Sequence, residues 1–180
     1  SDYSTTNIQV EGVDEPDFLK NDGKYIYIIS GKKLIIVNAF PANEMKILSE
    51  VELEDYASNL FLNGDKLIVF MNKYEYNDRG CVYPAPADAK IASGVAIDSI
   101  APCRGISKES TIVQIYDVSD RSEPEVDEEF EVSGNYVDAR MIGDFVYLIS
   151  TKYINLNNFE LPYYTRGDEK IIVSAEEVYY

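Results

Sequence analysis

The feature that most constrains the fold is a hairpin signal between residues 18 and 40. A turn sequence of Asn, Asp and Gly at 21–23 precedes an apolar run at 25–29, and a four-residue link then reverses the chain into a second apolar run at 34–37. This punctuation is typical of a β-hairpin. Neither run alternates cleanly between apolar and polar residues, which predicts strands covered on both faces although the hairpin makes them antiparallel. A propeller meets both conditions, because its small antiparallel sheets stack face to face.

The turn-plus-strand signal recurs twice, at 61–70 and at 141–149. In each copy an apolar pair precedes a Gly-containing turn, and glycine allows the positive φ that such turns need. Gly23 and Gly64 lie 41 positions apart, which is the size of one propeller blade, whereas Gly64 and Gly143 lie 79 positions apart. The repeat therefore favours successive blades, and the longer step is interpreted as one blade that carries an insertion.

The composition of the longer step supports that interpretation. The strand expected at 66–71 has a hairpin partner at 111–118, and the segment between them, 72–109, is rich in Pro, Ala, Gly and Ser. Two further segments, 46–53 and 126–132, follow their hairpins and show alternation between apolar and charged residues. Alternation indicates one wet face, which suits the outermost strand of a blade.

These signals together predict an all-β chain of two to three four-stranded antiparallel blade units. The third copy is expected to detour through 155–164 and to regain its partner strand at 170–174. Because known propellers close with at least about four blades, we expect a part of a larger propeller, within a longer protein or completed by copies of the chain. The expected parts are an N-terminal arm at 1–17 and a partial β-propeller domain at 18–180, with blade 1 at about 18–56, blade 2 at about 57–134 including the insertion 72–109, and a partial blade 3 at about 135–180.

Charge and composition narrow the function classes. The 180 residues include 16 Lys plus Arg against 32 Asp plus Glu, a formal net charge of −16, and contain neither His nor Trp. Such an acidic chain repels phosphate backbones and anionic lipids, so no nucleic-acid partner is expected. The missing His removes histidine-dependent catalysis and nearly every catalytic zinc or haem site. No apolar run reaches the length of a membrane span, so no direct membrane insertion by this segment is expected.

Several stretches of the sequence resemble a known family. They read YSTTNIQVEGVDEPD at 3–17, continued by FLKNDGKYIY at 18–27, then IYDVSD at 115–120 and SGNYVDARMIGD at 133–144. The long opening motif is the specific one, and it resembles the start of a family of secreted or surface β-propeller proteins of archaea and bacteria, distantly related to WD-repeat propellers. The resemblance implies a propeller much longer than this chain, an extracellular or cell-surface location, and no established activity.

Cys81 and Cys103 are the two cysteines of the chain, and both lie in the 72–109 insertion, 22 positions apart. We predict that they form a disulfide, which would stabilise the fold by about 3 kcal/mol by constraining the unfolded chain. A disulfide requires an oxidising compartment, and two free thiols are the alternative. Neither cysteine is expected to be catalytic, because the chain has no His to activate it.

The densest carboxylate group of the arm comprises Glu11, Asp14, Glu15 and Asp17. Closely spaced carboxylates are ligands for Ca²⁺, and Glu11, Asp14 and Asp17 are the candidate metal ligands, although their spacing is not that of an EF-hand. A solvated acidic turn is the alternative, and no other cofactor is expected. The acidic run at 123–131 is interpreted as the wet face of an outer strand.

Exposed aromatic side chains are the candidate partner-binding residues. Tyr74, Tyr76 and Tyr83 lie in the insertion, where rigid amphipathic rings can anchor a partner surface or pin their own loop. Tyr163 and Tyr164 have the same two interpretations. The tripeptide at 166–168 reads Arg-Gly-Asp, which some adhesion receptors bind, and which also suits an inter-strand turn.

The first functional hypothesis is a non-catalytic extracellular interaction or scaffold module that meets a protein or cell-surface partner through its insertions and inter-strand loops. A calcium-dependent structural or adhesion module is one alternative. A carboxylate-dependent hydrolase that requires the missing blades is another, since 32 acidic residues make a chance pair of facing carboxylates easy to find. Self-association is also expected, because open blade edges seek partners.

Overall fold

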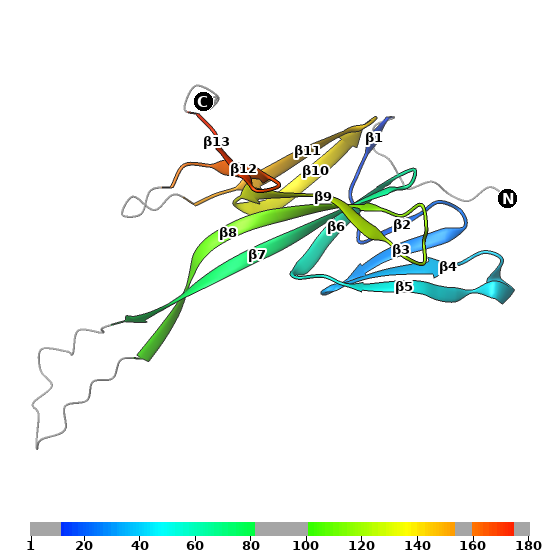
Figure 1. Cartoon of the computed structure of the whole chain (residues 1–180), viewed down its shortest axis with the longest axis horizontal. Coiled ribbons are helices and arrows are strands. Elements are labelled where there is room, and N and C mark those ends of the chain that lie inside the picture. The colour runs from blue at the N-terminus through cyan, green and yellow to red at the C-terminus, as the bar shows by residue number, and fades with distance from the viewer. Residues whose placement is uncertain (1–11, 82–100, 154–159, 175–180) are drawn as a thin grey trace, which may run out of the picture. The chain divides into compact units, whose positions relative to one another are not determined.

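The part of the chain that the structure describes is built from β-strands, as the sequence predicts (Figure 1). The computed structural model describes residues 12–81, 101–153 and 160–174. Two compact units are present, one formed by 1–73 with 109–180 and the other by 74–108. Across the described residues, no helix has the length and apolar character that a membrane crossing needs.

The first sheet is a four-stranded antiparallel meander whose strands follow one another in chain order. The predicted hairpin is its centre, because Tyr27 pairs with Ile36 and Ile28 pairs with Ile35. Gly31 has a φ of +64°, the left-handed conformation that a tight hairpin turn requires. A short 3₁₀ helix, η1 (Ala42–Glu44), leads into the outer strand. The strands are β2 (Leu19–Asn21), β3 (Tyr25–Ser30), β4 (Lys33–Asn38) and β5 (Lys46–Glu52).

The second sheet has six strands in the order β13-β12-β9-β8-β7-β6. It contains the predicted long-range hairpin, because the strand beginning at Lys66 neighbours the strand that ends at Asp117. These two strands are longer than expected and include the flanks of the 72–109 insertion, whereas 82–100 lies outside the described residues. The strands are β6 (Tyr56–Asn63), β7 (Lys66–Cys81), β8 (Ala101–Asp117), β9 (Glu125–Ser133), β12 (Tyr163–Arg166) and β13 (Glu169–Ile172).

The placement of β12 and β13 corrects two expectations. The segment near 170–174 was expected to complete the third blade, but β13 pairs with β12, and β12 pairs with β9 of the second sheet. Consequently β9 is not an outermost strand, although its first five residues are exposed. The physical reason is that the edge of β9 offers unpaired backbone groups, which the returning chain satisfies.

The third sheet contains the third copy of the repeat. Its strands β10 (Asn135–Ile142) and β11 (Phe145–Thr151) form an antiparallel hairpin. The end of the N-terminal arm, β1 (Val13–Asp14), pairs with β10. Further along the arm, Asp17 forms an isolated bridge with Leu60 of β6. The arm therefore holds strands of the second and third sheets together immediately before it enters the first.

Gly134 makes the junction between β9 and β10. Its φ is +96°, and an added Cβ would lie 2.7 Å from the carbonyl oxygen of Thr151. Its own carbonyl accepts a 2.9 Å hydrogen bond from the Thr111 hydroxyl, and its N–H donates to the Glu109 carbonyl at 2.9 Å. A side chain has no room at this close approach, so glycine is required where the chain leaves one sheet for the next.

The second sheet is buried on both of its faces. Leu67, Val69 and Met71 belong to the core cluster shared with the first sheet. Ile68 and Phe70, on the alternate face of the same strand, belong to the cluster shared with the third sheet. The second sheet thus has the two-sided burial that the sequence predicts for the hairpin of the first sheet. In that hairpin itself, β3 and β4 fully bury one face and leave the other only partly buried. The sheets stack face to face, as blades do.

Replacing Phe70 with Ala should lower the free energy of unfolding by about 3–5 kcal/mol, because truncation leaves a cavity between the second and third sheets. The Phe70 ring is fully buried, with an edge-on contact to Phe61 at 5.8 Å between ring centroids. Urea denaturation followed by circular dichroism measures the change. Tyr153→Ala, at a side chain that is 82% exposed, is the control and should change stability by less than about 0.5 kcal/mol. Equal losses in both variants would contradict the two-sided core.

Candidate functional site

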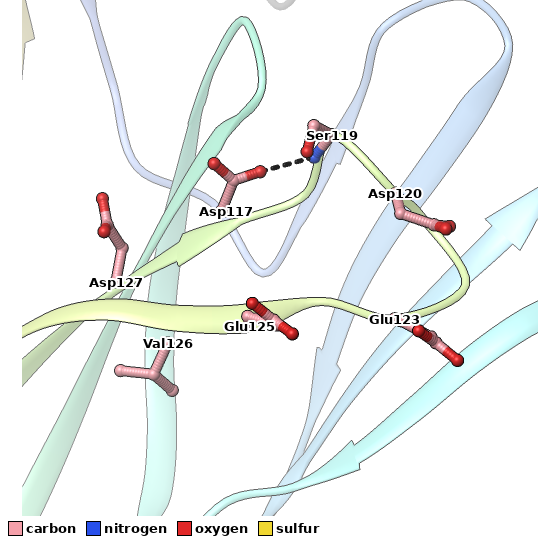
Figure 2. A pocket seen from close by; sticks show the side chains of 7 residues that line it. All are labelled: Asp117, Ser119, Asp120, Glu123, Glu125, Val126 and Asp127. Carbon is pink, nitrogen blue, oxygen red and sulfur yellow. Dashed lines mark hydrogen bonds between the residues drawn. The ribbon is translucent and has the colours of Figure 1, made fainter.

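The connection between β8 and β9 surrounds an open concavity of about 390 Å³ (Figure 2). Most of its lining side chains carry a carboxylate, and they come from the end of β8, the turn and the start of β9. The lining residues are Asp117, Ser119, Asp120, Glu123, Glu125, Val126 and Asp127.

Two short-range hydrogen-bonded turns shape this connection. The Oδ1 atom of Asp117 accepts a hydrogen bond from the N–H of Ser119 at 2.8 Å, which is the dashed line in Figure 2. The Oδ1 atom of Asp120 accepts from the N–H of Ser122 at 2.9 Å and from its hydroxyl at 2.8 Å. Asp closes such turns readily because its side chain reaches the backbone two residues on. Both carboxylates therefore hold the local fold.

The same contacts keep these carboxylates ionised. Hydrogen bonding to Ser119, followed by the contact with Lys66, holds the pKa of Asp117 well below its usual range. The backbone hydrogen bond from Ser122 lowers the pKa of Asp120. Lys66 Nζ lies 2.9 Å from Asp117 Oδ2 and 3.0 Å from Asp127 Oδ2, so it bridges the two strands. A general acid of a carboxylate pair has a raised pKa, whereas the pKa values of Asp117 and Asp120 are lowered.

Arg121, from the same connection, reaches the first sheet, and sequence reasoning missed it. Its guanidinium pairs with Asp65 at 2.6 Å, approaches Asp22 at 3.7 Å and donates to the Tyr27 hydroxyl at 3.1 Å. Burial raises the pKa of Tyr27 to about 12, and the protonated hydroxyl donates to Asp22 at 2.9 Å. A single cation within an acidic turn is the one sequence signal that could have indicated this role. Arg121 therefore fastens the first sheet to the second.

The predicted calcium ligands of the arm have other partners where the structure describes them. Asp14 Oδ1 accepts from Lys20 Nζ at 2.9 Å, and the Lys20 side chain is only 5% exposed. Asp17 Oδ1 accepts from the N–H of Phe18 at 2.7 Å. Glu11 lies outside the described residues. No group of three or more Asp, Glu, Cys or His in the described ranges could hold a metal ion. Calcium binding by Glu11, Asp14 and Asp17 stays a prediction, and Lys20 would compete with the ion.

The candidate tyrosines fall into two kinds. Tyr74 and Tyr76 lie on the extension of β7 and are 40% and 49% exposed, whereas Tyr83 lies outside the described residues. Tyr163, in contrast, is buried against β9, and its hydroxyl donates to Glu131 at 2.7 Å. Tyr163 therefore pins its own segment to the second sheet, and the insertion tyrosines stay the candidates for partner binding.

The two cysteines lie on neighbouring strands. Cys81 is the last residue of β7, Cys103 is the third residue of β8, and the two strands are adjacent in the second sheet. The side chains of both lie outside the described residues, so the disulfide stays a prediction. The Arg-Gly-Asp sequence at 166–168 forms the turn between β12 and β13, where Gly167 has a φ of +55°. The turn interpretation is confirmed, and the adhesion interpretation stays untested.

Stacked antiparallel sheets built on one repeated hairpin define an all-β protein of propeller type. The chain belongs to the family described as the beta propeller domain, whose model matches residues 3–180. The predictions of family and fold class are thereby confirmed. Propeller domains commonly mediate protein interactions.

Two archaeal relatives are similar over most of this chain. An uncharacterized protein of Methanocaldococcus jannaschii is 27% identical over 166 residues, which is 89% of this chain and 20% of the relative. An uncharacterized protein of Archaeoglobus fulgidus is 25% identical over 169 residues, or 85% of this chain and 20% of the relative. The chain thus spans about a fifth of the length of these relatives. No solved structure matches the chain.

Replacing Asp117 with Asn should lower the free energy of unfolding at neutral pH. It should also make that free energy depend less on pH in the acidic range. The folded-state pKa of Asp117 lies below the ordinary value of 3.8. Its stabilisation is therefore fully present above the ordinary pKa and is lost as the pH falls through the folded-state pKa. Urea denaturation at several pH values between 7 and 2 measures this difference. Glu123→Gln, at a lining carboxylate outside these hydrogen bonds, is the control, and parallel pH profiles for Asp117→Asn and the wild type would contradict the assignment.

Proposed function

We propose that the chain is a non-catalytic extracellular interaction or scaffold module whose partner-binding surface is the β7 extension. The observation that carries the proposal is the exposure of Tyr74 and Tyr76. Residues two apart in a strand point to the same face, so both rings lie on one face of β7. Exposed tyrosines supply large contact areas at a low cost in conformational entropy, and they are common anchors of protein interfaces.

A contact on the opposite face of the extension helps to hold the strand that carries these rings. Glu75 lies between the two tyrosines in sequence and faces the other way, and its Oε1 atom lies 3.4 Å from Lys108 Nζ of β8. This ion pair links β7 to its neighbouring strand. A binding surface on a paired strand loses less entropy on binding than one on a free loop.

The role of the carboxylates supports a non-catalytic function. Asp117 and Asp120 accept the hydrogen bonds that shape the β8–β9 connection, and Asp14 is paired with Lys20. These acidic side chains therefore act in folding. The extracellular part of the proposal is supported by the two cysteines on adjacent strands, because disulfides persist in oxidising compartments.

The wild type should bind partners among solubilised cell-surface proteins of the source cells. The double variant Tyr74→Ala/Tyr76→Ala should bind them with an affinity at least about tenfold lower, since each anchor ring contributes more than about 1 kcal/mol. Immobilised protein and quantitative mass spectrometry of the retained proteins measure the loss. Tyr56→Ala/Tyr153→Ala, which removes two tyrosines exposed elsewhere, is the matched control and should retain the same proteins. Full retention by Tyr74→Ala/Tyr76→Ala would exclude the β7 extension as the contact surface.

Alkylation of the unreduced, denatured protein tests the predicted disulfide. A Cys81–Cys103 bridge leaves no thiol for iodoacetamide, so intact mass spectrometry should show no label before reduction and two labels after it. Because the bridge constrains the unfolded chain, reduction should also lower stability by about 3 kcal/mol. The same protein prepared with reductant throughout is the control. Two labels on protein taken from its native compartment without reductant would refute the bridge and remove its support for an extracellular location.

A further inference from the structure

The repeat places two side chains of the third sheet, Tyr147 and Ile149, at positions that are buried in the two sheets before it. In each copy, the second, fourth and sixth residues after the turn glycine point to the same side of the sheet, because side chains alternate along a strand. In the first two copies that side faces the next sheet along the chain. The equivalent sets are Tyr25, Tyr27 and Ile29 after Gly23, Lys66, Ile68 and Phe70 after Gly64, and Phe145, Tyr147 and Ile149 after Gly143.

The burial of these equivalent positions changes abruptly at the third sheet. Tyr27 and Phe70 are fully buried against the sheet that follows them. In the third sheet Phe145 is 71% exposed, and Tyr147 and Ile149 are each 56% exposed. Ile142 extends this surface, because it pairs with Phe145 across the hairpin and is also exposed. We name Ile142, Phe145, Tyr147 and Ile149 the trailing face.

The first sheet carries the complementary surface. The third and fifth residues after the turn glycine face the preceding sheet in later copies, as Leu67 and Val69 do against the first sheet. In the first sheet these positions are Ile26 and Ile28, which are partly buried and belong to neither core cluster of the described residues. Across the strands Ile26 pairs with Val37, Ile28 with Ile35 and Val37 with Ile47, whereas Ile35 pairs with Glu50 on β5. We name Ile26, Ile28, Ile35, Val37 and Ile47 the leading face.

We propose that the trailing face of one chain binds the leading face of a second copy of the chain. Both inter-sheet contacts within the chain join a trailing position to a leading position, so the same pairing between copies repeats a geometry that the structure already contains twice. Apolar faces of this kind mark interaction sites. The two surfaces differ, so the contact is head to tail, and the copies either close a ring or continue as a chain.

The charge of the chain makes the assembly depend on salt. Each copy carries a formal net charge of −16, and copies of the chain repel one another. Sodium chloride screens that repulsion. Association should therefore tighten as sodium chloride is raised, which is opposite to the behaviour of a contact held by ion pairs.

Light scattering of the 180-residue chain and of one variant per face tests the proposal. The wild type should have a mass above that of one chain. Tyr147→Glu on the trailing face and Ile47→Glu on the leading face should each weaken self-association by at least about tenfold. Tyr153→Glu makes the same charge change outside both faces and should assemble like the wild type. Circular dichroism checks that each variant is folded, and both changed side chains are already more than half exposed.

Mixing the two face variants gives the decisive result. Tyr147→Glu keeps its leading face and Ile47→Glu keeps its trailing face, so an equimolar mixture should form a dimer of one copy of each. A monomeric wild type, self-association of either variant at wild-type strength, or a monomeric mixture would each overturn the proposal. The Tyr74→Ala/Tyr76→Ala variant should assemble normally, so failure of this proposal and failure of the tyrosine surface are distinguishable.

Discussion

The structure depends on the apolar stacking of the second sheet against both of its neighbours. Leu67 and Val69 pack toward the first sheet while Ile68 and Phe70 pack toward the third, so one strand supplies two cores. A sheet that is apolar on both faces needs a neighbouring sheet on each side to bury them. Repeat proteins in general are stabilised by such contacts between neighbouring units. In the described residues, the outer faces of the first and third sheets also carry exposed apolar side chains, Ile47 on the first and Tyr147 and Ile149 on the third.

Polar contacts hold this stack together at its margins and give structural partners to several of its carboxylates. Arg121 ties the β8–β9 connection to Asp22 and Tyr27 of the first sheet, and Lys20 holds Asp14 of the arm. In both places a buried or half-buried cation meets carboxylates, so the charges stabilise the arrangement of segments.

Local patterns predicted the hairpins well because each depends on a few adjacent residues. The turn glycines located β3 with β4 and β10 with β11, and the apolar pattern correctly joined β7 to β8 across the insertion. The strands at the end of the chain were assigned to the wrong sheet, because the pairing of β12 with β9 depends on which edge is open in space. Arg121 was missed for the same reason, since its partners lie far away in sequence.

By itself the sequence determined the strand content, the repeat and the acidic, histidine-free chemistry, because turns and two-residue periodicity are properties of neighbouring residues. Only the tertiary structure decided which apolar side chains are buried. Tyr27, Ile68 and Tyr147 occupy equivalent places in the repeat, yet the first two are buried and the third is exposed. The physical reason is that a side chain on a stacked sheet is buried only where another sheet packs against it in space. The residues next to it in sequence do not determine that packing.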